Sequence, residues 1–214
     1  MKSRPCGLFG DETCAKFHLG EDQIKAFNQL AYQLQQMQMG APCSPMRLYI
    51  EGVAGTGKTC LVHAIIDFFT ESECLTYLQT SAYMAHAAGL IQGTTIHHAL
   101  NIRVTKYGKN QGSASFSVLQ EKVARIRFFI IDEISMVGAR FFSKIQTQLQ
   151  SGKEDGGVEL FGGVNLVFVG DFLQLPPVAD AALYSELPER PKTCDVTEGL
   201  VPWSQLAHSV KLNQ

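Results

Sequence analysis

Residues 52–59 read GVAGTGKT, which matches the spacing of a phosphate-binding loop. A strand-like sequence, RLYIE, precedes the loop, and an apolar helical sequence follows it. Glycines let backbone N–H groups turn toward phosphate oxygens, and the start of the helix adds its positive dipole end. We expect Lys58 to reach the β- and γ-phosphates and the Thr59 hydroxyl to ligate Mg²⁺. A glycine-rich turn that contains Lys-Thr by chance is the alternative. The predicted nucleotide-binding residues are Gly52, Val53, Ala54, Gly55, Thr56, Gly57, Lys58, Thr59 and Cys60.

Two adjacent carboxylates, Asp132 and Glu133, follow the mostly apolar run RFFII. The run predicts a buried strand that ends where α/β sheets bind ligands. There Asp132 can hold magnesium through water, and Glu133 can orient and deprotonate the attacking water. An acidic pair that only caps the next helix is the alternative.

An amide, Gln174, follows the apolar run 164–169 and the pair Gly170-Asp171, on a loop stiffened by two prolines. An amide can donate to a γ-phosphate oxygen while it accepts from the attacking water. Gln174 is therefore a third candidate catalytic residue, and it would detect the difference between ATP and ADP. A glutamine that only faces solvent is the alternative.

Strands and helices must alternate to position these motifs. Their alternation predicts an α/β fold with a mainly parallel central sheet flanked by helices. Residues 1–18 show no period, and we expect a flexible N-terminal arm there, followed by one domain over residues 19–214. The expected strands are 46–50, 74–80, 127–131 and 164–169, and the expected helices are 21–37, 58–69, 83–90, 118–126 and 139–149.

Composition narrows the functional classes. The net charge of −2 argues against a protein that coats nucleic acid over its whole surface, although it allows a local basic face. No stretch approaches the roughly 20 apolar residues of a membrane span, and we expect no membrane partner. The six cysteines form no CxxC pair and are expected to be reduced thiols of an intracellular protein.

The three motifs together resemble those of a known family. GVAGTGKT, IIDEISMV and FGGVNLVFVGDFLQLPPV, in this order and spacing, resemble the Pif-type DNA helicases, which are RecD-like motors of superfamily one. Helitron-type helicases share the pattern. The resemblance covers roughly residues 19–214 and implies a RecA-like P-loop NTPase domain with ATP and Mg²⁺ as cofactors. It also implies translocation on single-stranded DNA in the 5′-to-3′ direction, roles in DNA repair, recombination or telomere maintenance, and a nuclear or mitochondrial location.

The resemblance also extends to residues outside the three motifs. LGEDQIKAF resembles the family's N-terminal glutamine motif, so Gln23 would read the adenine edge; a simple helix cap is the alternative. QTSAYMAHAAGLIQGTTIHHAL resembles the family's strand-bound elements. The family's Thr-Gly before the paired alanines is missing here, which leaves the contacts of Tyr83 and His86 open. Structural hydrogen bonds are the alternative for His97 and His98. The candidate DNA contacts are Thr80, Ser81, Thr95, His97, His98, Lys106 and Lys109.

Charge in residues 90–127 agrees with a DNA contact, because this segment has six basic residues and one acid in a chain of net charge −2. Scattered positive charge with an aromatic such as Tyr107 or Phe116 suits binding to a single strand without sequence preference. A solvated loop is an equal alternative.

Two functions of different classes remain open. The first is an ATP-dependent DNA helicase motor domain, expected to be a fragment, because the chain ends at VKLNQ before the family's arginine motif and second RecA-like domain. The second is a nucleotide- and DNA-binding module with little turnover, because that arginine is expected to be missing. Gln174 and the Asp-Glu pair argue against a small-molecule kinase.

Overall fold

A central parallel sheet organises the molecule. The computed structural model describes residues 10–102, 120–153, 158–186, 194–206 and 208–213. Within these ranges the strand order is β3-β2-β4-β5-β1-β6, and every pairing of these strands is parallel. The predicted α/β class with a parallel sheet is confirmed. The strands are β1 (Arg47–Glu51), β2 (Leu78–Ala82), β3 (Thr94–Thr95), β4 (Phe128–Asp132), β5 (Asn165–Gly170) and β6 (His208–Lys211).

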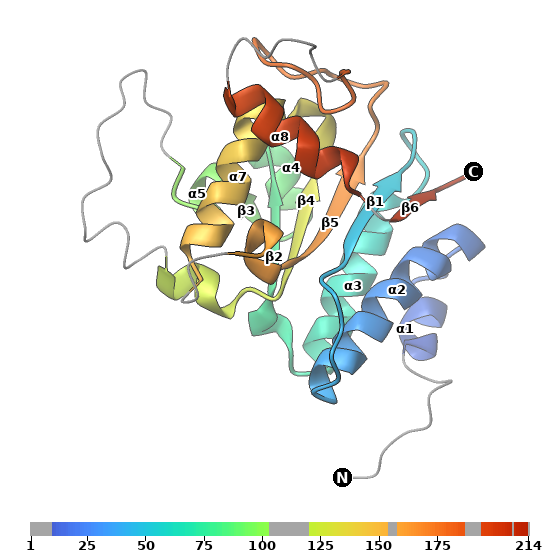
Figure 1. Cartoon of the computed structure of the whole chain (residues 1–214). Helices are drawn as coiled ribbons and strands as arrows, with labels where there is room; N and C mark the ends of the chain where they lie inside the picture. Colours follow the sequence, from blue (N-terminus) through green and yellow to red (C-terminus); the bar gives the residue numbers. More distant parts are fainter. Residues whose placement is uncertain (1–9, 103–119, 154–157, 187–193, 207, 214) are drawn as a thin grey trace.

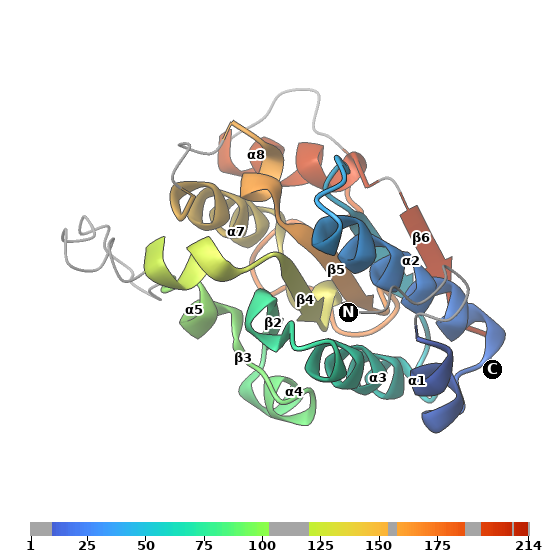
Figure 2. The ribbon, with the colours of Figure 1, turned by 90° about the horizontal axis from the view of Figure 1, so that it is seen from below.

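Helices lie on both faces of the sheet (Figures 1 and 2). The first three helices cover one face, and α7 and α8 cover the other. The helices are α1 (Asp11–Lys16), α2 (Glu21–Gln38), α3 (Lys58–Glu71), α4 (Ala85–Leu90), α5 (Ile96–Ala99), α7 (Ala139–Ser151) and α8 (Cys194–Ser204). Residues 120–125 are also helical. Short 3₁₀ turns occupy η1 (Leu75–Tyr77), η2 (Ile134–Met136) and η3 (Leu160–Gly163).

Successive strand residues enter two separate apolar cores, because strand side chains alternate between the faces of a sheet. Leu48 and Ile50 of β1 pack with α1, α2 and α3, whereas Tyr49 packs with α7 and its neighbours. In β5, Val167 and Val169 face the first core, and Phe168 faces the second. Burial on both faces explains why these strands read as continuous apolar runs.

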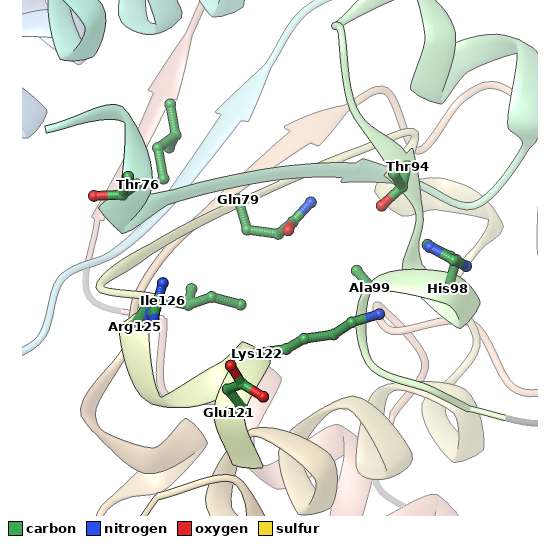
Figure 3. Close-up of a pocket in the computed structure, with 10 residues that line it drawn as sticks. Thr76, Gln79, Thr94, His98, Ala99, Glu121, Lys122, Arg125 and Ile126 are labelled. Atoms are coloured by element: carbon green, nitrogen blue, oxygen red, sulfur yellow. The ribbon is translucent and has the colours of Figure 1, made fainter. Parts of the chain in front are cut away.

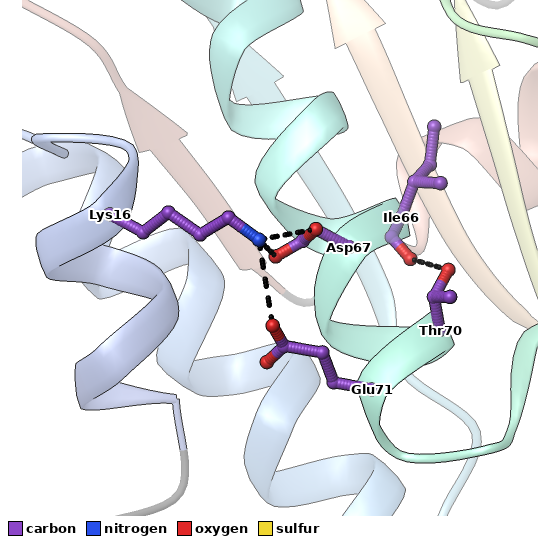
Figure 4. Close-up of polar contacts among 5 residues, drawn as sticks. All are labelled: Lys16, Ile66, Asp67, Thr70 and Glu71. Carbon is purple, nitrogen blue, oxygen red and sulfur yellow. Dashed lines mark hydrogen bonds and ion pairs between the residues drawn. The ribbon is translucent and has the colours of Figure 1, made fainter.

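The N-terminal helix α1 corrects one prediction. The expectation of a flexible arm over residues 1–18 is wrong for Asp11–Lys16, which is helical and packs against α3. Figure 4 shows Lys16 reaching α3, where its Nζ lies 2.7 Å from Asp67 Oδ2 and 3.5 Å from Glu71 Oε1. Cys14 is buried in the same core. The six residues of α1 include one buried cysteine and no large apolar residue, so they show no recognisable period.

Other boundaries also differ from the prediction. The strand expected at residues 74–80 begins later, at Leu78, because residues 75–77 form the turn η1. The strand then continues through Ser81 and Ala82, whose small side chains are fully buried. β3, β6 and α8 were not predicted, and α8 contains Pro202. Across the described ranges, no helix combines the length and apolar character needed to cross a membrane.

Candidate functional site

The loop between β1 and α3 has the backbone of a phosphate-binding turn. Gly55 and Gly57 have φ values of 86° and 79°, which residues with side chains rarely adopt. Gly57 is the N-cap of α3, so the exposed N–H groups of the first helical turn face the loop. The Gly52 N–H donates to Gly170 O at 3.2 Å, which ties the loop to the end of β5.

Lys58 folds over this loop. Its Nζ donates to Gly52 O at 2.6 Å and to Val53 O at 3.0 Å. The Thr56 hydroxyl also donates to Val53 O, at 2.9 Å. The loop carbonyls therefore hold the ammonium beside the backbone N–H groups that would face a phosphate.

Gln23 connects α2 to the same loop. Its Nε2 donates to Gly57 O at 3.0 Å, and its Oε1 accepts from Gly20 N at 2.7 Å. A side chain at position 57 would displace the Gln23 amide, and the positive φ of Gly57 favours glycine there. Nε2 also donates to Thr56 O at 3.5 Å, so both of its N–H groups have carbonyl partners, whereas Oε1 keeps one free lone pair.

The two carboxylates at the end of β4 have different environments. Asp132 is 8% exposed, and its Oδ1 accepts from Glu133 N at 2.8 Å. Burial raises the pKa of Asp132 to about 6, although that hydrogen bond and the Lys58 ammonium oppose the shift. Glu133 is partly exposed and has a φ of 55°, a strained conformation for a residue with a side chain. The strained backbone turns the chain sharply between the strand and η2.

Gln174 lies on an exposed turn after β5. Asp171, 5% exposed, accepts from Leu173 N at 2.9 Å and from Gln174 Nε2 at 3.2 Å. Sequence reasoning gave Asp171 no role, yet it organises this turn. The position of Asp171 directly after the predicted strand was the sequence signal that could have indicated this role. Leu173 and Val178 flank the turn and are 89% and 85% exposed.

Strand order brings these groups to one edge of the sheet. β5 pairs with β1 on one side and with β4 on the other. The phosphate loop, Asp171 with its turn, and the carboxylate pair therefore follow the carboxyl ends of three neighbouring parallel strands. This edge is where parallel α/β sheets bind ligands.

The oxygen groups available here suit magnesium. Mg²⁺ binds oxygen and usually keeps waters and substrate phosphates in its coordination shell. Thr59 at the start of α3 and Asp132 would supply a hydroxyl and a carboxylate. Among the residues that the structure describes, no three His, Cys, Asp or Glu side chains gather as a metal cluster. One hydroxyl and one carboxylate fit a metal ion whose other ligands are water and nucleotide phosphates.

The candidate DNA contacts in β2 are buried. Thr80 is 8% exposed, and Ser81 is fully buried. Gln79 Nε2 donates to Thr80 O at 2.7 Å and lies 3.4 Å from Ser81 Oγ. The strand runs two residues further than expected, and little of the Thr80 side chain and none of the Ser81 side chain is accessible in this conformation.

The candidates around α5 divide into internal and exposed groups. Thr95 caps α5, because its Oγ1 accepts from His98 N at 3.3 Å. His97 stacks on Phe141 with ring centroids 4.5 Å apart, and Tyr83 packs edge-on against both rings. Burial lowers the pKa of His97, and the positive charge of Lys144 acts in the same direction. These contacts support a structural role for His97, whereas His98 is exposed.

Four residues of the predicted DNA-contact segment lie outside the described residues. They are Lys106, Lys109, Tyr107 and Phe116. Sequence reasoning missed Asp180, whose carboxylate accepts from Arg140 N at 3.1 Å and caps α7. It also missed the contact of Asn213 Nδ2 with Asp22 Oδ2, 2.9 Å, beside Gln23. Both contacts join residues distant in sequence, and no local pattern indicates them.

Residues 18–191 match the family model of the PIF1-like helicases. Among curated proteins, the chain is 32% identical over 150 residues to the ATP-dependent DNA helicase PIF1 of Xenopus laevis, covering 69% of this chain and 23% of that protein. It is 34% identical over 149 residues to the Danio rerio protein of the same name, covering 65% and 21%. The chain thus spans about a fifth of the length of these relatives.

Solved structures of similar proteins agree on the fold. A Bacteroides Pif1 helicase in complex with ADP-AlF3 and single-stranded DNA has a TM-score of 0.56 at 26% identity, over 75% of this chain and 34% of that one. The Candida albicans Pif1 helicase has a TM-score of 0.62 at 23% identity, over 92% and 39%, and supports the fold alone. The predicted RecA-like fold is confirmed.

Proposed function

The chain belongs to the PIF1-like helicase family, and we propose that it is the ATP-hydrolysing motor domain of a DNA helicase that moves along single-stranded DNA. The observation that carries this proposal is the sheet order β1-β5-β4. It places a phosphate loop, a glutamine turn and an Asp-Glu pair on neighbouring strands. The Bacteroides relative is described with ADP-AlF3 and single-stranded DNA, which supports the same two ligand classes here.

Each residue at this edge has a proposed task. Lys58 leaves the loop carbonyls and neutralises the β- and γ-phosphates, and the loop N–H groups hold their oxygens. Thr59 and Asp132 hold Mg²⁺, which would spread the negative charge of the phosphates. Glu133, more exposed than Asp132, orients the attacking water and accepts its proton. Gln174 exchanges the Asp171 carboxylate for the γ-phosphate.

Gln23 is proposed to read adenine by exchanging its longest present contact, from Nε2 to Thr56 O at 3.5 Å, for a contact with the base. Its second N–H and its second Oε1 lone pair match the N7 acceptor and N6 donor of adenine. DNA contact is proposed for Thr95, His98, Lys106 and Lys109, with action inside the cell, in the nucleus or in mitochondria. Thr80, Ser81 and His97 are better explained as structural residues.

The second candidate function is a nucleotide- and DNA-binding module with little turnover. It is favoured by the chemistry of phosphoryl transfer, where an added arginine raises rates by about 10³ to 10⁵. A second RecA-like domain is the expected source of such an arginine. The two candidates therefore predict different turnover: hydrolysis stimulated by single-stranded DNA for the motor, and slow, unstimulated hydrolysis for the binding module.

The test compares nucleotide binding and turnover in wild type, Lys58→Ala and Lys25→Ala. Lys25 is an exposed lysine of α2 that pairs with Asp22 and serves as the matched control. Loss of a charged hydrogen bond costs about 1.5–3 kcal/mol. We expect Lys58→Ala to weaken binding of a fluorescent ATP analogue by about 10- to 150-fold, with the control unchanged. Equal binding by all three proteins would refute the proposed nucleotide site. Measurable hydrolysis that oligo-dT stimulates would favour the motor over the binding module.

A further inference from the structure

A basic hollow lies beside β2, at the edge of the sheet farthest from the phosphate loop. Its volume is about 540 Å³, and it opens between β2, α5 and the helical segment 120–125 (Figure 3). β4 and β5 separate β2 from β1, so the hollow is distinct from the proposed nucleotide site. β3 pairs only with Ser81 and Ala82, which leaves Leu78 and Gln79 of β2 without a strand partner on this side in the described chain.

The charged groups of the hollow are mainly positive. Lys122 and Arg125 line it, three residues apart on one helix face, and Glu121 is the single acidic residue among those that line it. Both cations are exposed. In the described part of the chain, the ion pairs involve Lys16, Lys25 and Lys211 instead. The two cations of the hollow therefore have no carboxylate partner among the described residues.

The cations occupy different parts of the hollow. Figure 3 shows Arg125 on the Thr76 side, whereas Lys122 extends toward Ala99 and His98. Side chains that bind one free phosphate converge on one point, and these two do not. Separated cations suit a series of phosphates along a strand.

The remaining lining suits the sugars and bases between phosphates. Leu78, Ala99 and Ile126 supply apolar surface, and the Thr76 and Thr94 hydroxyls can donate hydrogen bonds.

We propose that this hollow binds the sugar–phosphate backbone of a single nucleic-acid strand, with Lys122 and Arg125 each contacting a phosphate. The site extends the proposed DNA path from α5 around the open edge of β2. It rests on the proposed function, because it deepens the DNA-binding part of that function.

A photo-crosslinking residue at Thr76 tests where the strand lies. The probe is a fluorescent 15-residue oligo-dT, and the matched control carries the crosslinker at Asn28, an exposed position on α2. We expect crosslinking from position 76 and not from position 28. Excess thymidine monophosphate should fail to compete, because it lacks linked phosphates. Equal yields at the two positions, or full competition by the monophosphate, would overturn a strand site.

Salt dependence tests the two cations. Each single-strand phosphate contact contributes about 0.7 to the slope of log K against log salt, so Lys122→Ala/Arg125→Ala should lower that slope by about 1.4. The control Lys25→Ala/Lys211→Ala removes the same charge from carboxylate-paired lysines and should leave the slope unchanged. An unchanged slope in the first variant, or a wild-type chain that does not bind oligo-dT, would overturn the proposal. Unchanged nucleotide binding in Lys58→Ala would refute the nucleotide site instead.

Discussion

Replacing Gln23 with alanine separates two roles of one amide, because the roles predict different nucleotide preferences. The substitution removes the hydrogen bond to Gly57 O, which positions the phosphate loop for any nucleoside triphosphate. A neutral hydrogen bond contributes about 1 kcal/mol, so this loss should weaken ATP and GTP alike by about fivefold. The bond to Gly20 N is exposed, and water can replace it.

If Gln23 recognises adenine, the substitution should further weaken the binding of ATP but not that of GTP. A paired amide contact to adenine is worth about 1–3 kcal/mol of discrimination. With the loop contribution, Gln23→Ala should weaken ATP binding by about 2–4 kcal/mol, or about 30- to 1000-fold. GTP binding should fall only by the loop contribution. The variant should therefore lose most of the ATP-over-GTP preference.

Displacement of a fluorescent nucleotide by ATP and by GTP measures both affinities. Asn28→Ala removes an exposed amide from the same helix and is the matched control. Thermal unfolding checks the fold, since about 2 kcal/mol corresponds to a shift of about 4–8 °C in a chain of this size. Equal losses for ATP and GTP would refute adenine recognition and leave the positioning role. Unchanged affinity for both would refute the positioning role as well.

Two further variants probe the carboxylate pair and a buried cation. Glu133→Gln should keep Mg·ATP bound and stop its hydrolysis, and single-turnover hydrolysis equal to wild type would show that Glu133 is not the base. Lys153 donates to the carbonyls of Val123 and Ile126 at 3.0 and 2.8 Å, and burial lowers its pKa from 10.5 to about 8. Between pH 8 and 10.5 the unfolded chain keeps Lys153 protonated, whereas the folded chain does not. The free energy of unfolding of the wild type should therefore rise over this pH range. Lys153→Met should flatten that rise in denaturant titrations.

Local patterns predicted the strands that hold the candidate residues. The phosphate loop and the Asp132–Glu133 pair each follow an apolar strand, so a short window of sequence holds both the reactive group and the element that positions it. Gln174 was located for the same reason. The alternation of strands and helices then predicted a parallel sheet, in which the ends of such strands meet at one edge.

Contacts between distant residues were beyond this reasoning. The sequence allowed His97 to be either an exposed contact or an internal group. Its stacking on Phe141 of α7 supports the internal position. Ser81 is buried between β3 and β4, and Thr80 lies against Gly93. The Gln23–Gly57 bond joins positions 34 residues apart. Tertiary packing sets all three, and none leaves a periodic signal.

The contacts of Lys58 and Gln174 share a property that suits a nucleotide-driven motor. Lys58 donates to loop carbonyls, and Gln174 donates to the Asp171 carboxylate. In the proposed function, a bound triphosphate would offer each donor a charged oxygen in exchange, whereas the diphosphate would offer Gln174 none. A ligand shifts a conformational equilibrium only through contacts that differ between the two states. Asp171 directly follows β5, which pairs with both β1 and β4. The exchange at Gln174 would therefore act on a turn anchored in the centre of the sheet. The exposed leucines beside Gln174 would move with that turn, so the γ-phosphate would change the surface that this edge presents to a neighbouring domain.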